Sequence, residues 1–253
     1  MSNTVKSIFF TLALCLLCGS LLAGASKGLK DRQWENLMTD RRKNILKSVW
    51  LINEEKQYTS DKINALYAEN IKQVNVTESG IVVTDSIIKN IPDVRIFPIY
   101  LYIQSDGSIA SYIIPIDTKG LWGKIHGYLS LKTDGSTING FTVYKHSETP
   151  GLGGEIEKNW FQKNFAGKKI VNRNGSFVSL SIAKGKVEDK VPKERRTNYV
   201  DGISGATLTG KFLAKGLEET LAAYEPISIR FRKNNFKNYT QIENTSTLNN
   251  EAD

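Results

Sequence analysis

The sequence predicts an α+β protein, in which one N-terminal transmembrane helix precedes a mainly antiparallel sheet domain with flanking helices. Three observations predict this class. Residues 7–26 form an uncharged apolar run, segments with strand-like composition occur in pairs around Asp-Gly turns, and segments with helical periodicity lie apart from those pairs. Strands that cluster as hairpins, rather than alternating with helices, indicate an antiparallel sheet.

The N-terminal run has two interpretations. As a helix it would be about 30 Å long, which is the thickness of the hydrocarbon core of a bilayer. It could also be a cleaved signal peptide, with Lys6 as the basic region and residues 23–25 as the small-residue cleavage site. Its length favours a membrane anchor at residues 7–26, preceded by a short N-terminal end at residues 1–6. Basic residues are more numerous after the run than before it, which favours a cytoplasmic domain, although this rule is weak for long domains.

Helical periodicity recurs in three places beyond the anchor. It predicts an amphipathic helix over residues 31–56, inside a connecting segment at residues 27–60. It also predicts a short helix over residues 156–165 and a longer one that begins near residues 204–207 and reaches Leu221. These helices would flank the sheet.

Segments rich in β-branched and aromatic residues predict strands over residues 96–103, 109–116, 127–132, 137–144 and 177–182. Asp106-Gly107 and Asp134-Gly135 separate the first four into two hairpins, because glycine accepts the positive φ of such turns. The α+β domain is therefore expected at residues 61–231. Residues 232–253 carry many asparagines and few aliphatic side chains, which predicts a mobile polar tail.

Composition limits the chemistry. Counted with Gly and without Tyr, the apolar share is about 44%, close to the roughly 45–50% of globular chains, which excludes a disordered, collagen-like or multi-span membrane protein. The net charge of +8 suits an anionic partner such as nucleic acid, lipid headgroups or a phosphate-bearing cofactor. Cys15 and Cys18 both lie in the apolar run, so the domain has no thiols, and its histidines are only His126 and His146. No metal site is expected, and both histidines are interpreted as structural, without an acidic partner nearby in sequence.

A glycine-rich segment, Asp201-Gly202-Ile203-Ser204-Gly205-Ala206-Thr207-Leu208-Thr209-Gly210, leads into the second long helix. Its small residues allow a ligand to approach the backbone, and the start of the helix offers unpaired N–H donors with a partial positive charge. Such a place attracts phosphate. The alternative is a helix capped by Ser or Thr after a glycine-rich turn.

A nucleotide-binding P-loop is a competing interpretation of this segment. Residues 205–211 fit the first seven positions of the pattern G-x-x-x-x-G-K-[ST]. The eighth position is Phe212, which has no hydroxyl for magnesium, and no buried parallel strand is predicted before the loop. A nucleotide-hydrolysing P-loop is therefore disfavoured.

The segment at residues 201–207 matches the D-G-x-[ST]-G-A-T signature of proteins that carry FMN joined through its phosphate to the final threonine. With Gly120-Leu121-Trp122 and Glu148-Thr149-Pro150-Gly151-Leu152-Gly153-Gly154-Glu155, the chain resembles the C subunit of the sodium-translocating NADH:quinone oxidoreductases. This FMN-binding domain family is shared with the G subunit of the Rnf complexes, but Gly-Leu-Trp and Gly-Gly-Glu favour the former. The likeness spans about residues 5–225 and departs at Gly210, where the family more often has serine.

The resemblance implies that a separate flavin transferase attaches FMN covalently to Thr207, because an unactivated threonine without an adjacent histidine base has no reason to react alone. Ser204, Gly205 and Ala206 would wrap the phosphate and ribityl chain, while the flexible loop after residue 148 would lie beside the flavin ring. The expected cofactor-binding residues are Thr207, Asp201, Ser204, Gly205, Ala206, Leu208, Thr209, Glu148, Thr149, Gly151, Leu152, Gly153 and Trp122.

Non-cofactor roles stay open at three of these positions. Asp201 could make a turn hydrogen bond, Trp122 could pack in the core, and Glu148 could be a solvated loop carboxylate. No residue is assigned to catalysis or to a metal.

By resemblance, the protein is an electron-carrying flavoprotein subunit, not catalytic alone, of a membrane complex that couples NADH oxidation and ubiquinone reduction to Na⁺ translocation. Its expected partners are the other subunits of that complex, the membrane and the flavin transferase, with no nucleic acid. The expected location is the cell inner membrane, single-pass, with the FMN domain on the periplasmic side. The alternatives are an Rnf-type G subunit, or an anchored or secreted binding module with unmodified Thr207.

Overall fold

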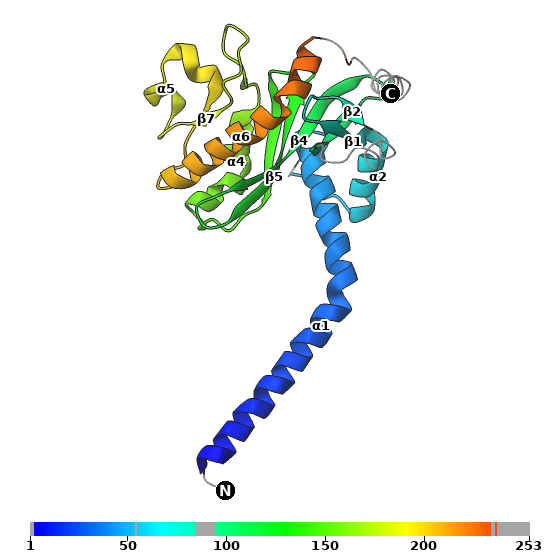
Figure 1. Cartoon of the computed structure of the whole chain (residues 1–253), viewed down its shortest axis with the longest axis vertical. Helices are drawn as coiled ribbons and strands as arrows, with labels where there is room; N and C mark the ends of the chain where they lie inside the picture. The colour runs from blue at the N-terminus through cyan, green and yellow to red at the C-terminus, as the bar shows by residue number, and fades with distance from the viewer. Residues whose placement is uncertain (1–2, 54, 84–94, 234–235, 237–253) are drawn as a thin grey trace. The chain divides into compact units, whose positions relative to one another are not determined.

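The structure is a computed structural model that describes residues 3–53, 55–83, 95–233 and 236 (Figure 1). The chain divides into two compact units, Met1–Arg41 and Arg42–Asp253. The second unit contains the whole sheet and every residue expected to bind the cofactor. The predicted tail falls almost entirely outside the described residues, which include only Phe236 beyond Lys233.

The first element is a long helix, α1 (Asn3–Ser48), which includes the predicted anchor. Among the described residues it is the one helix long and apolar enough to cross a membrane. The helix ends at Ser48 rather than near residue 56, because Trp50 adopts a left-handed φ of 63°. The Trp50 N–H donates to the Lys47 carbonyl and the Leu51 N–H to the Leu46 carbonyl, each at 3.1 Å, which is the hydrogen-bond pattern of a Schellman motif.

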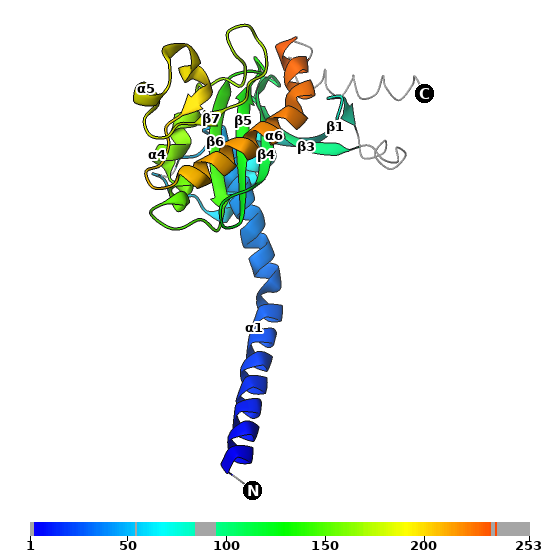
Figure 2. The ribbon, with the colours of Figure 1, turned by 60° about the vertical axis from the view of Figure 1, so that its left-hand side comes forward.

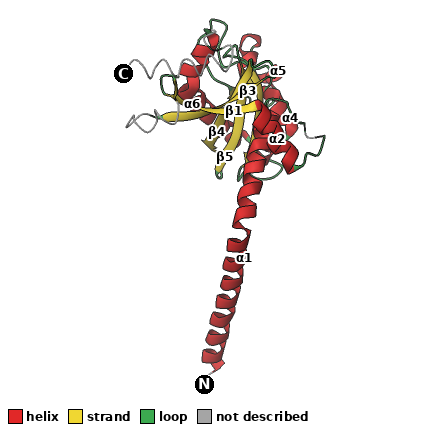
Figure 3. Ribbon diagram, turned by 90° about the vertical axis from the view of Figure 1, so that its right-hand side faces the viewer, coloured by secondary structure: helices red, strands yellow, loops and turns green. Residues whose placement is uncertain are grey.

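A six-stranded antiparallel sheet forms the centre of the second unit, with strand order β2-β1-β3-β4-β5-β6 (Figure 3). The strands are β1 (Ile71–Thr77), β2 (Val82–Val83), β3 (Ile96–Ile103), β4 (Ile109–Lys119), β5 (Lys124–Lys132) and β6 (Ile138–Lys145). The α+β class is confirmed, and both hairpins turn at the expected glycines, with φ values of 79° at Gly107 and 62° at Gly135. Strands β1 and β2 were not predicted.

Both faces of the sheet are covered. On one face lies α6 (Thr207–Arg232), which crosses the strands in Figure 2, and on the other lie the end of α1 and α2 (Ser60–Asn70). The alternation of β4 shows the division: Tyr112 and Ile114 belong to the core under α6, whereas Ile113 belongs to the core under α1 and α2. Strand β4 is apolar on both sides because helices cover both faces of the sheet.

Between β6 and α6 the chain forms short elements: η1 (Gly153–Glu157), α4 (Asn159–Gln162), η2 (Lys163–Phe165), β7 (Ser181–Ile182), α5 (Val187–Lys190), η3 (Lys193–Asn198) and β8 (Tyr199–Val200). The single helix predicted over residues 156–165 is thus wrong, because the stretch is divided into separate turns. The strand predicted over residues 177–182 is reduced to β7, since Ser179 takes a left-handed φ of 60°.

Helix α6 begins where the sequence predicts and extends past Leu221 to Arg232. Pro226 lies inside it. The added turns bury Ile227 and Phe231 in the core under α6, where Phe231 stacks on Tyr112 with ring centroids 4.2 Å apart. Burial of apolar side chains thus supports the helix beyond the proline that interrupts its hydrogen bonds.

Candidate functional site

The three sequence motifs meet in one hollow at the start of α6. Its volume is about 320 Å³, within the range of ligand pockets. Its lining consists of Leu121, Trp122, Glu148, Thr149, Leu152, Gly153, Gly205, Ala206, Thr207, Leu208 and Thr209. The structure therefore brings together segments that are far apart in sequence. Leu121 is the lining residue that the sequence analysis did not select, although it lies inside the Gly-Leu-Trp motif.

Thr207 is the first residue of α6 and is exposed. The preceding N-cap is Ala206, which makes no side-chain capping hydrogen bond, so the alternative of a Ser- or Thr-capped helix is wrong. The chain enters the helix through Gly205, whose φ is 73°. A side chain at position 205 would also meet Leu152, since a Cβ there would lie 2.8 Å from its Cδ2 atom. The first amides of α6 are thus left for an anion.

The rim of the hollow is apolar and open to solvent. Trp122 is 70% exposed, so core packing, which the sequence left open for it, is wrong. Leu121, Leu152 and Leu208 are also exposed large apolar side chains. Exposed apolar groups gathered at one hollow mark a place where an apolar ligand or partner would be covered.

Glu148 is only 4% exposed, so it is not a solvated loop carboxylate. Its Oε1 atom accepts a hydrogen bond from the Trp122 N–H at 3.0 Å, and its Oε2 atom accepts one from the Thr209 hydroxyl at 2.6 Å. The carboxylate therefore joins all three motifs at the floor of the hollow.

The loop after Glu148 is an ordered turn. The Thr149 carbonyl accepts hydrogen bonds from the Leu152 N–H at 3.1 Å and from the Gly154 N–H at 2.8 Å. Gly151, at the tip, has a φ of 73° and open space around it. It does not line the hollow. The backbone of this loop thus makes hydrogen bonds within the loop itself.

Asp201 does not line the hollow. Its Oδ1 atom accepts a hydrogen bond from the Val187 N–H at 2.7 Å, and its Oδ2 atom pairs with the Lys186 ammonium at 2.9 Å. Partial burial opposes ionisation, but these two partners hold the pKa of the Asp201 carboxyl below its usual range. The side chain therefore holds α5 to the strand before the glycine-rich segment. Ser204 is exposed and likewise does not line the hollow.

Both histidines have acidic neighbours that the sequence did not indicate. His146 accepts a hydrogen bond at Nδ1 from the Glu148 N–H at 3.1 Å, and its Nε2 atom lies 3.2 Å from the Glu157 carboxylate. His126 lies 3.7 Å from the Asp117 carboxylate. Neither histidine lines the hollow, so neither is placed to remove a proton from the Thr207 hydroxyl.

The structure does not support a P-loop at residues 205–211. Helix α6 begins at Thr207, so the stretch that would wrap a nucleotide's phosphates is already helical. A parallel strand does precede the segment, contrary to the sequence prediction. However, β8 is two residues long and pairs only with β7, which is equally short.

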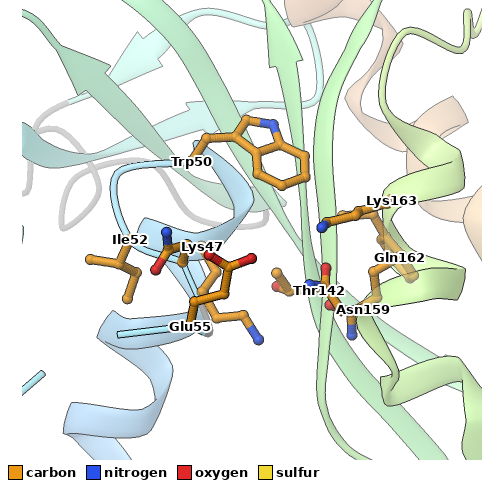
Figure 4. Close-up of a pocket in the computed structure, with 10 residues that line it drawn as sticks. Lys47, Trp50, Ile52, Glu55, Thr142, Asn159, Gln162 and Lys163 are labelled. Atoms are coloured by element: carbon orange, nitrogen blue, oxygen red, sulfur yellow. The ribbon is translucent and has the colours of Figure 1, made fainter. Parts of the chain in front are cut away.

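Two other hollows do not bring the three motifs together. One of about 220 Å³ lies between the segment after α1, with Trp50 and Glu55, and the short helices that carry Asn159 and Lys163 (Figure 4). It contains none of the expected cofactor-binding residues. Another, of about 280 Å³, is also lined by Ala206 and Thr207, together with residues of β7 such as Ile182. Thr207 thus lines both hollows, and the 320 Å³ one is the one that unites the three motifs.

Comparison with known proteins also places the three motifs in one domain. A family model described as "FMN-binding domain" matches residues 120–222. The C subunit of the Na(+)-translocating NADH-quinone reductase of Yersinia pestis is 31% identical over 231 residues, covering 81% of this chain and 83% of that protein. The corresponding protein of a Neisseria meningitidis serogroup A strain is 32% identical over 234 residues, covering 81% and 84%.

Two solved structures are similar. The crystal structure of the C subunit of the Na(+)-translocating NADH-quinone reductase from Parabacteroides distasonis superimposes with a TM-score of 0.65 at 33% identity, covering 79% of this chain and 96% of that chain. Shewanella oneidensis NqrC gives a TM-score of 0.60 at 22% identity, covering 76% and 98%. The second likeness shows the fold.

Proposed function

The chain belongs to the family formed by the C subunits of Na(+)-translocating NADH-quinone reductases, and on this premise we propose that it is the electron-carrying flavoprotein of such a complex. FMN is attached covalently, through its phosphate, to the hydroxyl of Thr207. The observation that carries this proposal is the position of Thr207, exposed at the first turn of α6 and on the lining of the hollow that unites the three motifs.

The attachment residue is suited to hold a phosphate but not to react alone. The phosphodiester formed at Thr207 retains a negative charge, which the uncapped N-terminus of α6 stabilises. A threonine hydroxyl is a weak nucleophile without a base, and His146 is engaged at both ring nitrogens. A separate flavin transferase therefore carries out the attachment.

The protein positions the cofactor and excludes water from one side of it. Trp122, Leu152 and Leu208 would provide an apolar rim for the flavin ring, and Gly205 would let the backbone approach it closely. When bound, FMN supplies the electron transfer, which the chain's own residues cannot perform. The open rim leaves an edge of the site accessible to a partner protein, as a relay between other redox centres requires.

Helix α1 anchors the protein in the cell inner membrane, with the FMN domain on the periplasmic side. Its apolar run at residues 7–26 has no charged side chain, so it offers no path for an ion. Na⁺ translocation therefore belongs to the partner subunits, and the relationship to the family assigns NADH oxidation and ubiquinone reduction to them as well. Protease treatment of intact spheroplasts tests the orientation: the domain should be digested, and its protection would contradict a periplasmic location.

Mass spectrometry tests the attachment. The full chain, co-expressed with a flavin transferase, should gain the mass of one FMN less one water, and peptide mapping should place that mass on Thr207. Thr207→Ala should abolish the gain and the in-gel flavin fluorescence. Thr197→Ala is the matched control, because Thr197 is an exposed threonine that lies outside both the signature and the hollow, and the variant should retain the flavin. A bare Thr207 peptide from natively matured protein would contradict the proposal.

A further inference from the structure

We propose that Glu148 is a positioning residue whose buried carboxylate fastens the turn carrying Trp122 and the first turn of α6 to the loop after β6, and so sets the shape of the hollow. Where it concerns the flavin, this inference rests on the proposed function. It gives Glu148 and Thr209, which the sequence analysis expected to contact the cofactor, a role within the chain, where they bond to each other and Glu148 also accepts from the Trp122 N–H.

The tether spans large separations in sequence. Trp122 lies 26 residues from Glu148 and Thr209 lies 61 residues from it, yet both donate hydrogen bonds to the same carboxylate. The backbone of Glu148 is fixed in turn, because its N–H donates to His146 Nδ1 at 3.1 Å. One side chain therefore links three segments that are otherwise held by separate parts of the fold.

Two glycines leave the space that the Glu148 carboxylate occupies. A Cβ at Gly120 would lie 2.5 Å from Glu148 Oε1, and a Cβ at Gly153 would lie 2.8 Å from Glu148 Oε2 and clash with the Thr209 hydroxyl. Any larger residue at either position would push the carboxylate off its partners. The glycines of the Gly-Leu-Trp and Gly-Leu-Gly-Gly motifs thus serve the tether, in addition to any approach of a ligand.

Replacing Glu148 with glutamine distinguishes the role of its hydrogen bonds from the role of its charge. In Glu148→Gln, the amide oxygen still accepts from the Trp122 N–H, and the amide NH₂ donates to the Thr209 hydroxyl, which can accept as well as donate. The tether survives and the negative charge is lost. In Glu148→Ala both hydrogen bonds are lost, which leaves buried partners unsatisfied.

Hydrogen exchange of the full chain in detergent, without flavin, tests the tether directly. The amide of Trp122 should exchange at least about tenfold faster in Glu148→Ala than in the wild type, because its acceptor is gone. Glu148→Gln should stay within about threefold of the wild type. The amide of Leu129, fully buried in β5, reports whether each variant is folded.

Two further comparisons make the exchange test specific. Thr209→Val should speed exchange of the Trp122 amide, whereas Thr209→Ser, which keeps a hydroxyl, should restore protection. Glu155→Ala is the matched control, because Glu155 lies in the same loop and bonds only to the Trp160 indole among the contacts the structure gives its side chain, at 3.1 Å. Unchanged exchange at Trp122 in folded Glu148→Ala would overturn the tether.

The flavin-loaded protein supplies the second readout. After co-expression with the transferase, Glu148→Gln should shift the midpoint potential and fluorescence of the flavin less than Glu148→Ala does, because Gln keeps both hydrogen bonds that shape the hollow. If Glu148→Gln shifts them as far as Glu148→Ala, then the charge of Glu148 acts on the flavin and the positioning role is wrong. A wild-type chain that carries no flavin would refute the proposed function, while the exchange experiment would still decide the tether.

Discussion

The sheet and the segment that follows it are stabilised in different ways. Strands β3 to β6 are joined by backbone pairing along their length, with bulges in two of the three pairs, and buried apolar side chains cover both faces. Residues 146–206 contain only short helices and two short strands. This second region provides the loop after Glu148 and the glycine-rich segment, which make up most of the hollow.

In residues 146–206, which lack long paired strands, side chains also hydrogen-bond to the backbone and hold it in place. The Asn198 amide donates to the carbonyls of Lys169 at 2.6 Å and Val171 at 3.0 Å. The Gln162 amide, buried, donates to the carbonyl of Glu157 at 3.0 Å. Because such bonds are local and individually modest, changes in the sheet should reduce global stability, whereas changes in the segment should alter the site. The following variants test this division, from the largest expected loss of stability to the smallest.

Ile114→Ala should have the largest effect. Ile114 is fully buried in β4 under α6, so truncation leaves a cavity and should lower the free energy of unfolding by about 2–5 kcal/mol. Denaturant titration of the full chain in detergent measures this, with Ile229→Ala on the exposed side of α6 as the control. The folded fraction should carry flavin normally, and loss of flavin from folded protein would contradict the division.

Gly135→Ala should cost more than Gly107→Ala, although both glycines turn hairpins with positive φ. Open space surrounds Gly107, so its substitution costs only the left-handed strain, about 1–2 kcal/mol. A Cβ at Gly135 would clash with the Ser228 carbonyl and lie 2.9 Å from the Arg232 nitrogen in α6, which adds about 1–3 kcal/mol. Equal melting temperatures for the two variants would show that α6 is not seated tightly on this hairpin.

Asp201→Ala should cost about 1–2 kcal/mol through its lost hydrogen bonds to Val187 and Lys186. Because the pKa of Asp201 is lower in the folded state than in the unfolded state, its stabilisation is fully present above about pH 4 and is lost as the pH falls through the folded pKa. The difference between wild type and variant should therefore be constant at neutral pH and shrink on acidification. A difference that grows in acid would contradict the assigned sign.

Thr207→Ala should have the smallest effect on stability and the largest on the cofactor. Its side chain is exposed, so the free energy of unfolding of the flavin-free chain should change by less than about 0.5 kcal/mol. Denaturant titration of protein expressed without the transferase measures this. A loss comparable with that of Ile114→Ala would mean that Thr207 is part of the structural framework.

The sequence predicted the hairpin strands well because their signal is local. Asp-Gly pairs between β-branched runs specify both the turn and the strands beside it, and β3 occupies the predicted residues 96–103. Strand β1 was missed because polar residues such as Lys72 and Asn75 interrupt its apolar pattern. The end of α1 was misplaced because Trp50, rather than a glycine, takes the left-handed position, where its indole donates to the Asn139 carbonyl at 2.7 Å.

The candidate site likewise contains features that the sequence predicted and features that it did not. The small residues such as Gly205 and the start of the helix can be identified in the sequence itself, and the resemblance to a known family added Thr207, Trp122 and Leu152. The burial of Glu148 could not be predicted in this way, because its hydrogen-bond partners come from positions 26 and 61 residues away.

By itself, the sequence determined the apolar anchor, the antiparallel hairpins, the position at which α6 begins and the three motifs of the family. Only the tertiary structure decided that Glu148 is buried, that Asp201 holds α5 rather than lining the hollow, and that both histidines are paired. The physical reason is that turns and helix starts depend on neighbouring residues, whereas burial and hydrogen-bond partners depend on segments that meet only in the folded chain.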